Sequence, residues 1–206
     1  MKSLFSLFLG AFVWCTSAFA QESPDALIQK VTDEVLTIVR QDKDIQNGNT
    51  KKAVALVETK VLPHFNFTRM TALALGREWS KTSAEQKTRL TNEFRILLVR
   101  TYSNALTAYK DQTVEYKPFK MQAGETDVIV RTLVHQTNGK HIGLDYALDK
   151  QADGWKVYDV VVAGVSLVTN YRESFTQEVR ANGVDGLIST LAAKNKGLEA
   201  AAVGKK

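Results

Sequence analysis

The polar residues that could carry out chemistry are few and widely spaced in this sequence. His135 and His141 flank an expected turn, where two imidazoles could bind a metal ion, but no third histidine or nearby cysteine completes the ligand set. His64 follows a proline in an expected loop and favours a structural or surface role. The histidines therefore predict a solvated surface rather than a metal centre.

Ser166 and Asp159 are the other candidates. Ser166 follows Gly164 and Val165, but the glycine spacing is not that of a nucleophile elbow, so we expect this serine to cap the following helix. Asp159 lies in an apolar strand, where a buried carboxylate needs a partner. Arg172 is the natural partner, and a structural ion pair is favoured over a general base.

The first twenty residues have the pattern of a Sec-type signal peptide. A short apolar run follows a positive start, and Ala18-Phe19-Ala20 has the small-x-small form of a cleavage site, so the mature chain should begin at Gln21. A lipoprotein signal at Cys15 is the disfavoured alternative, because a bulky residue precedes that cysteine. No later run is long and apolar enough to cross a bilayer.

Composition excludes several classes of protein. Cys15 is the only cysteine, so the mature chain lacks a thiol nucleophile, a Cys-ligated zinc and a disulfide scaffold. The whole chain has 27 Lys+Arg and 22 Asp+Glu, a net charge of +5, and these charges are interspersed. They indicate a solvated surface or weak attraction to an anionic membrane or acidic partner. Without a basic stripe and interleaved aromatics, nucleic acid is not an expected partner.

Helical patterns fill the first half of the chain. A first helix opens at Pro24, and shorter helices are predicted for residues 50–61 and 68–75. Ser83 begins the longest helix, and Gln86 completes a capping box with it. The broad apolar stripe of this helix is expected to pack on a sheet, or alternatively to line one wall of a cavity.

The apolar period then changes from helical to two, which predicts strands. Asn138-Gly139 and Asp153-Gly154 are hairpin turn signals, and the last strand is predicted at 155–163. These short connections force antiparallel neighbours, so the sequence predicts an α+β domain in which the apolar face of the sheet meets helices.

The chain returns to helix at 166–179, and Asn182-Gly183 separates that helix from a last one. The end of the chain is rich in Ala, Gly and Lys. We therefore expect a signal peptide at 1–20, a single domain at 21–195 and a disordered tail at 196–206.

Five blocks occur in a fixed order along nearly the whole mature chain. They are Ala74-Leu75-Gly76-Arg77-Glu78-Trp79, Ala84-Glu85-Gln86 with Phe94, Tyr102 to Tyr109, Trp155-Lys156-Val157-Tyr158-Asp159-Val160, and the most specific, Gly164-Val165-Ser166-Leu167-Val168-Thr169-Asn170-Tyr171-Arg172. Together they resemble the toluene-tolerance family of periplasmic phospholipid carriers. Asn66 stands where that family commonly has Asp, and Ala163 where it usually has Glu.

The resemblance implies a curved antiparallel sheet wrapped by helices, of the nuclear-transport-factor type, with a deep apolar cavity. It implies a bound phospholipid as cargo, with no cofactor, no metal and no catalytic residue. The implied role is that of a soluble periplasmic monomer in a Gram-negative cell, which maintains outer-membrane lipid asymmetry. Its implied partners are an inner-membrane ABC transporter complex with a mammalian-cell-entry-type substrate-binding protein, and an outer-membrane lipoprotein–porin complex.

We expect the lipid to lie between the long helix and the apolar face of the sheet. The expected lining residues are Phe94, Leu98, Tyr102, Val128, Val130, Ile142, Leu144, Tyr146, Val165, Val168 and Tyr171. Asp159 and Arg172 would latch a hinge at Gly164, with Tyr171 and Phe175 as an apolar lid. A rigid slot, open at one end, is the alternative.

Two other function classes stay open. One is a periplasmic small-molecule enzyme of the same fold class, for which Asp159 and Arg172 are the only candidate acid–base pair. The other is a chaperone-like module that binds apolar protein segments. Diacyl lipid that co-purifies with the protein would favour the carrier over both.

Overall fold

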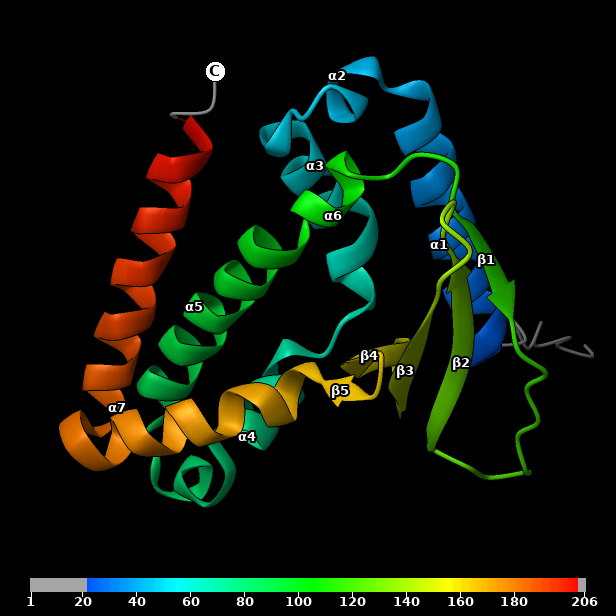
Figure 1. Cartoon of the computed structure of the whole chain (residues 1–206). Helices are drawn as coiled ribbons and strands as arrows, with labels where there is room; N and C mark the ends of the chain where they lie inside the picture. The colour runs from blue at the N-terminus through cyan, green and yellow to red at the C-terminus, as the bar shows by residue number, and fades with distance from the viewer. Residues whose placement is uncertain (1–21, 204–206) are drawn as a thin grey trace, which may run out of the picture.

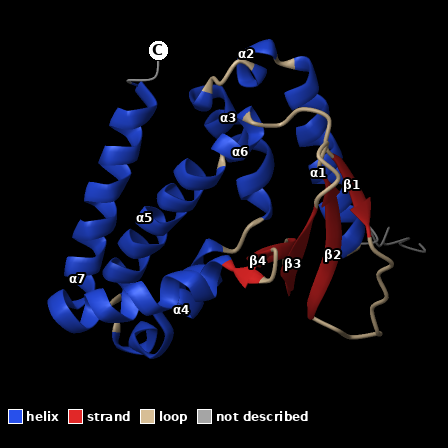
Figure 2. Ribbon diagram, in the orientation of Figure 1, coloured by secondary structure: helices blue, strands red, loops and turns tan. Residues whose placement is uncertain are grey.

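The computed structural model describes residues 22–203, in which an antiparallel sheet and two groups of helices form an α+β protein (Figures 1 and 2). The predicted signal peptide and its Cys15 alternative lie outside the described residues. Within the described range, no helix combines the length and the apolar character needed to span a membrane. The predicted fold class is confirmed.

The sheet has five strands, and each strand pairs antiparallel with the next one along the chain. The strands are β1 (Thr113–Tyr116), β2 (Asp127–His135), β3 (His141–Gln151), β4 (Gly154–Val162) and β5 (Val165–Ser166). Both predicted hairpins form, and their glycines, Gly139 and Gly154, take φ angles of 77° and 127°. Ala163 has a φ of 50° in the β4–β5 turn, a left-handed conformation that costs a non-glycine residue free energy.

Strand pairing places alternate side chains on one inner face of the sheet. Val128 and Val130 of β2 lie there beside Leu148 of β3. The first helix, α1 (Pro24–Gln41), covers this part of the face and adds Leu27 to a shared core (Figure 1). The expectation that the apolar face meets a helix is therefore confirmed, and the helix is the first one in the chain.

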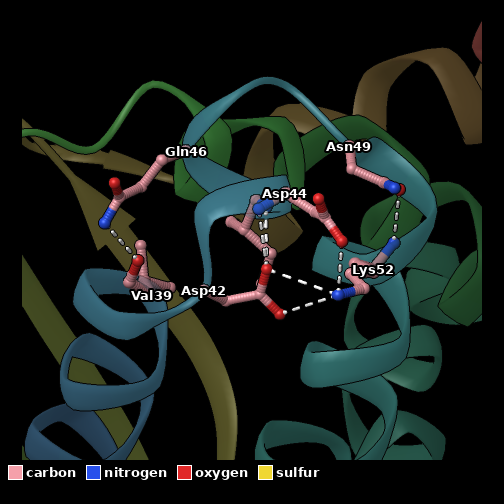
Figure 3. Close-up of polar contacts among 7 residues, drawn as sticks. Val39, Asp42, Asp44, Gln46, Asn49 and Lys52 are labelled. Atoms are coloured by element: carbon pink, nitrogen blue, oxygen red, sulfur yellow. Dashed lines mark hydrogen bonds and ion pairs between the residues drawn. The ribbon is translucent and has the colours of Figure 1, made fainter.

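A polar corner turns the chain back after α1. It contains α2 (Lys43–Gln46), α3 (Thr50–Leu56), the π-helical turn η1 (Val57–Val61) and the 3-10 turn η2 (Leu62–His64). The Asp42 carboxylate accepts hydrogen bonds from the backbone N–H of Asp44 at 2.9 Å and of Ile45 at 3.2 Å. Lys52 of α3 forms ion pairs with Asp42 at 3.2 Å and with Asp44 at 2.6 Å (Figure 3). These bonds fix α3 relative to the end of α1.

The second group of helices packs together beside the sheet (Figure 1). It comprises α4 (Phe67–Leu75), the 3-10 turn η3 (Gly76–Lys81), α5 (Ala84–Tyr102) and α7 (Leu167–Val203), whereas α6 (Asn104–Thr107) packs beside α2 and α3. The predicted capping box of α5 is confirmed, since Ser83 and Gln86 exchange two hydrogen bonds of 3.1 and 3.2 Å. The apolar stripe of α5 packs on α4 and α7, which corrects the expectation that it packs on the sheet.

The last helix is bent where the sequence predicted an interruption. Gly183 leaves the helical conformation with a φ of 70°, and α7 then continues to Val203. Arg100 of α5 donates to the carbonyl of Asn195 and forms an ion pair with Glu199 at 3.1 Å. Residues 196–203 are therefore helical rather than disordered, because contacts with α5 hold a segment whose composition alone favours fraying.

Candidate functional site

An apolar strip on the inner face of the sheet is only partly covered. By register, Val134 lies opposite Ile142, Leu144 opposite Val162, and Val162 opposite Val165, so the five side chains share one surface. Val165 is 57% exposed and the other four are half-buried. None of the five belongs to the three core clusters formed by the described residues. We call Val134, Ile142, Leu144, Val162 and Val165 the open strip.

A contiguous apolar surface outside the core can serve as a binding site. Water contact with apolar side chains is unfavourable by about 25 cal/mol per Å² of apolar area, so a folded protein covers such area where it can. Helix α1 covers the inner face of the sheet at Val130. Leu144 lies on the same face, two residues along β3 from the residue opposite Val130, and is only half-buried. The open strip is therefore suited to an apolar ligand.

The predicted lining residues fall into four places. The core of α4, α5 and α7 buries Phe94, Leu98 and Val168 and has Tyr171 packed against it. The core under α1 buries Val128 and Val130 and has Tyr146 packed against it. The open strip contains Ile142, Leu144 and Val165, whereas Tyr102 is 40% exposed at the end of α5. The structure thus brings three of the predicted residues together on one accessible surface, and a lipid contact at each stays a prediction.

Aromatic rings join α5 to the first part of α7. The Phe94 ring lies 5.1 Å from that of Tyr171 and 5.0 Å from that of Phe175, both edge to face. Burial and, next, the neighbouring Tyr102 raise the pKa of Tyr171 to about 12. Phe175 is only 2% exposed and belongs to the helical core, so the expected lid of Tyr171 and Phe175 is wrong at Phe175.

Asp159 organises the beginning of α7. Its carboxylate accepts hydrogen bonds from Ser166 Oγ at 2.5 Å and from the Val168 N–H at 3.1 Å. Ser166 Oγ in turn accepts from a backbone N–H at 2.9 Å, which confirms the predicted helix cap. Arg172 instead donates to the carbonyl of Leu73 at 3.0 Å. Among the described residues the predicted Asp159–Arg172 latch is therefore not formed, because the carboxylate is already engaged by the turn that precedes α7.

The three histidines lie in two places, the β2–β3 hairpin and the turn η2. His135 and His141 stack edge to face with ring centroids 4.6 Å apart, and His135 Nε2 lies 2.9 Å from a carboxylate oxygen of Glu115. Burial and, next, the positive charge of Lys156 lower the pKa of His64. In residues 22–203, no three His, Cys, Asp or Glu side chains are grouped so that they could hold a metal ion.

A charged network that the sequence did not reveal ties α4 to the sheet. Arg69 forms ion pairs with Asp127 at 2.6 Å and Asp149 at 3.0 Å, and its guanidinium lies 3.5 Å from the centre of the Tyr158 ring. Asn66 donates to Asp149 at 3.2 Å, a bond that an ionised Asp at this position could not make. Burial and a hydrogen bond to Asp127 raise the pKa of Tyr158 to about 12. Only the folded chain brings these positions together, so no local signal could have found them.

Comparisons with known proteins converge on one family. A sequence model described as "MlaC protein" matches residues 29–193. The "Intermembrane phospholipid transport system binding protein MlaC" of Haemophilus influenzae is 28% identical over 194 residues, 92% of this chain and 90% of that protein. The toluene tolerance protein ttg2D of Pseudomonas putida is 26% identical over 167 residues, 81% of this chain and 77% of that protein. These matches confirm the resemblance found in the sequence.

A solved structure is similar over most of the chain. It is the phospholipid-binding protein from Ralstonia solanacearum in complex with a phospholipid, with 39% sequence identity and a TM-score of 0.79. The similarity covers 85% of this chain and 98% of that one. The relation therefore extends over the sheet and both groups of helices rather than over one motif.

Proposed function

We propose that this chain, which belongs to the MlaC family, is a phospholipid carrier that holds acyl chains against the open strip. The observation that carries the proposal is the partly open apolar surface centred on Leu144 and Val162, outside every core cluster of the described residues. The similarity to a protein solved with a bound phospholipid supports it.

The chemistry of such cargo agrees with the apolar character of the strip. Burying one methylene group gains about 0.8 kcal/mol, so two chains of roughly sixteen carbons represent roughly 25 kcal/mol of transfer from water. A protein that holds this ligand needs apolar area and a route of exit, and it needs no reactive group. Because membranes offer the chains a similar environment, the net free energy of transfer stays small and cargo can be passed on.

The partners of Asp159 favour a carrier over an enzyme. The enzymatic alternative depended on a free acid–base pair of Asp159 and Arg172. Asp159 instead accepts hydrogen bonds from Ser166 and from the start of α7, and Arg172 donates to a backbone carbonyl. We propose that this protein binds and releases its ligand without chemical change.

The proposed place of work is the periplasm, in keeping with the signal-peptide pattern of the first twenty residues. There the carrier would exchange phospholipid with an inner-membrane ABC transporter complex, through its mammalian-cell-entry-type protein, and with an outer-membrane lipoprotein–porin complex. This exchange would maintain the lipid asymmetry of the outer membrane. Cleavage after Ala20 would remove Lys2 from the net charge of +5, and the remaining net charge of +4 would help to orient the carrier towards acidic partners.

Leu144→Glu tests the proposed surface. A carboxylate in contact with an acyl chain loses hydration without gaining a partner, so we expect lipid retained from fluorescent phospholipid vesicles to fall at least about tenfold. Ile129→Glu is the matched control, because Ile129 lies on the opposite face of the same sheet and is already 45% exposed. A folded Leu144→Glu protein that retains lipid as the wild type does would contradict the proposal.

A further inference from the structure

A cluster of hydroxyl groups interrupts the inner face of the sheet. The Tyr116 hydroxyl donates to Asp33 of α1 at 2.8 Å. Thr132 Oγ1 donates to the carbonyl of Leu144 at 3.0 Å. The Tyr146 side chain lies close to Thr132 and to Thr32 of α1. We call Thr32, Tyr116, Thr132 and Tyr146 the hydroxyl cluster.

Strand register places this cluster between the open strip and the core under α1. Thr132 lies opposite Tyr116 on one side and opposite Leu144 of the open strip on the other. Tyr146 lies opposite Val130, which α1 covers and which is 2% exposed. A ligand that extends along the open strip towards α1 therefore meets hydroxyl groups before it reaches the dry core.

The cluster is polar and uncharged at the tyrosines, and Tyr116 and Thr132 each donate to an acceptor beside it. Burial raises the pKa of both Tyr116 and Tyr146, so each phenol stays protonated and able to donate at neutral pH. Thr32 lies close to both tyrosines, and its neighbour Asp33 accepts the hydrogen bond of Tyr116, so α1 borders the cluster. A hydrocarbon chain that entered the cluster would separate the Tyr116 and Thr132 hydroxyl groups from their acceptors.

We propose that the hydroxyl cluster is the inner end of the lipid site and sets the longest acyl chain that the protein accommodates. The inference rests on the proposed function. Burying one more methylene gains less free energy than leaving a buried hydroxyl unpaired costs, so the hydrogen-bonded cluster stops chain entry. If the hydroxyl cluster served only to position α1 on the sheet, its substitution would change the stability of the protein. It would not change which acyl-chain lengths the protein binds.

Tyr146→Phe removes one hydroxyl of the cluster and keeps the ring. The variant and the wild type are incubated with vesicles that contain equal amounts of phosphatidylcholines from dimyristoyl to diarachidoyl, and native mass spectrometry measures the bound species. We expect the bound ratio of long to short chains to rise relative to the wild type, by about fourfold for each additional methylene accommodated. Thr132→Val, nearly equal in shape to the native residue, should shift the ratio in the same direction and serves if Tyr146→Phe does not fold.

Tyr158→Phe is the matched control, because it removes a hydroxyl of β4 that donates to Asp127 instead. An unchanged ratio in folded Tyr146→Phe and Thr132→Val would overturn the inference while lipid binding itself stands. An equal shift in Tyr158→Phe would also overturn it, since general loosening would then explain the effect. A wild-type protein that binds none of the lipids would overturn the proposed function as well.

Discussion

Asp159 shows how one carboxylate can position the start of a helix. It accepts from Ser166 Oγ at 2.5 Å and from the N–H of Val168 at 3.1 Å. The backbone N–H groups of a first helical turn lack partners inside the helix, and the helix dipole favours negative charge there. Asp159 is thus a cap for α7 from outside the helix, and the positive charge of Arg172 is not needed to stabilise it.

A double-mutant cycle tests this account. Asp159→Ala should lower the free energy of unfolding by about 1–2 kcal/mol through loss of the cap, and Arg172→Ala should lower it by less. Because the two side chains have different partners, the loss in the double variant should equal the sum of the single losses within about 0.5 kcal/mol. Urea denaturation measures all four proteins. A coupling energy above about 1 kcal/mol would show that Asp159 and Arg172 interact, and would contradict this account.

At the scale of elements, the Asp42 carboxylate is one of the groups that hold the corner between α1 and α3. Hydrogen bonding from the Ile45 N–H is the largest effect on the pKa of Asp42 and lowers it, whereas desolvation, the next largest, opposes this change. The hydrogen bond from Lys52 lowers the pKa further (Figure 3). A carboxyl whose pKa is lower in the folded state stabilises that state above its unfolded pKa of about 4. This contribution is lost as the pH falls through the folded pKa.

Asp42→Ala should therefore lower the urea midpoint at neutral pH, and the difference from the wild type should shrink as the pH falls below about 4. Asp111→Ala is the matched control, because Asp111 is exposed and shows no hydrogen bond or ion pair to any other described residue. Its difference from the wild type should not vary with pH. A pH-independent effect of Asp42→Ala would show that the corner is held by packing alone.

Local signals account for the elements that the sequence predicted correctly. Ser83 with Gln86, the turn at Asn138-Gly139 and the interruption at Gly183 each involve residues within one turn of each other, so their pattern can be recognised before folding. Local sequence does not predict which element packs against α5. Its apolar stripe is compatible with a sheet or with helices, and the structure shows that α4 and α7 cover it.

At the scale of the whole molecule, two cores meet along β4. Phe65 packs against both the core under α1 and the core of α4, α5 and α7, and it pairs with Val157 at the edge of β4. Arg69 reinforces this junction through its two ion pairs. The open strip extends across the sheet to β5, the strand that leads into α7.

The site was predictable where alternation along a strand decides the face. Ile142 and Leu144 follow from the period of two, and the structure places them on the open strip. Val165 also lies there, but in β5, a strand that the sequence did not predict. The helical wall was not predictable to the same extent. Phe94 and Val168 have the same apolar character as lining residues, but mutual packing of the helices buries them in the core. Hydrophobic pattern alone does not separate residues that contact a ligand from those that contact each other.

The most direct test is native mass spectrometry of the wild-type chain, purified without detergent from cells that express it. The account predicts a complex with diacyl phospholipid that dissociates into protein and intact lipid on activation. The lipid should exchange for another diacyl species when vesicles are added. Protein that carries no lipid as purified, and takes up none from vesicles, would contradict the proposal that the open strip holds phospholipid.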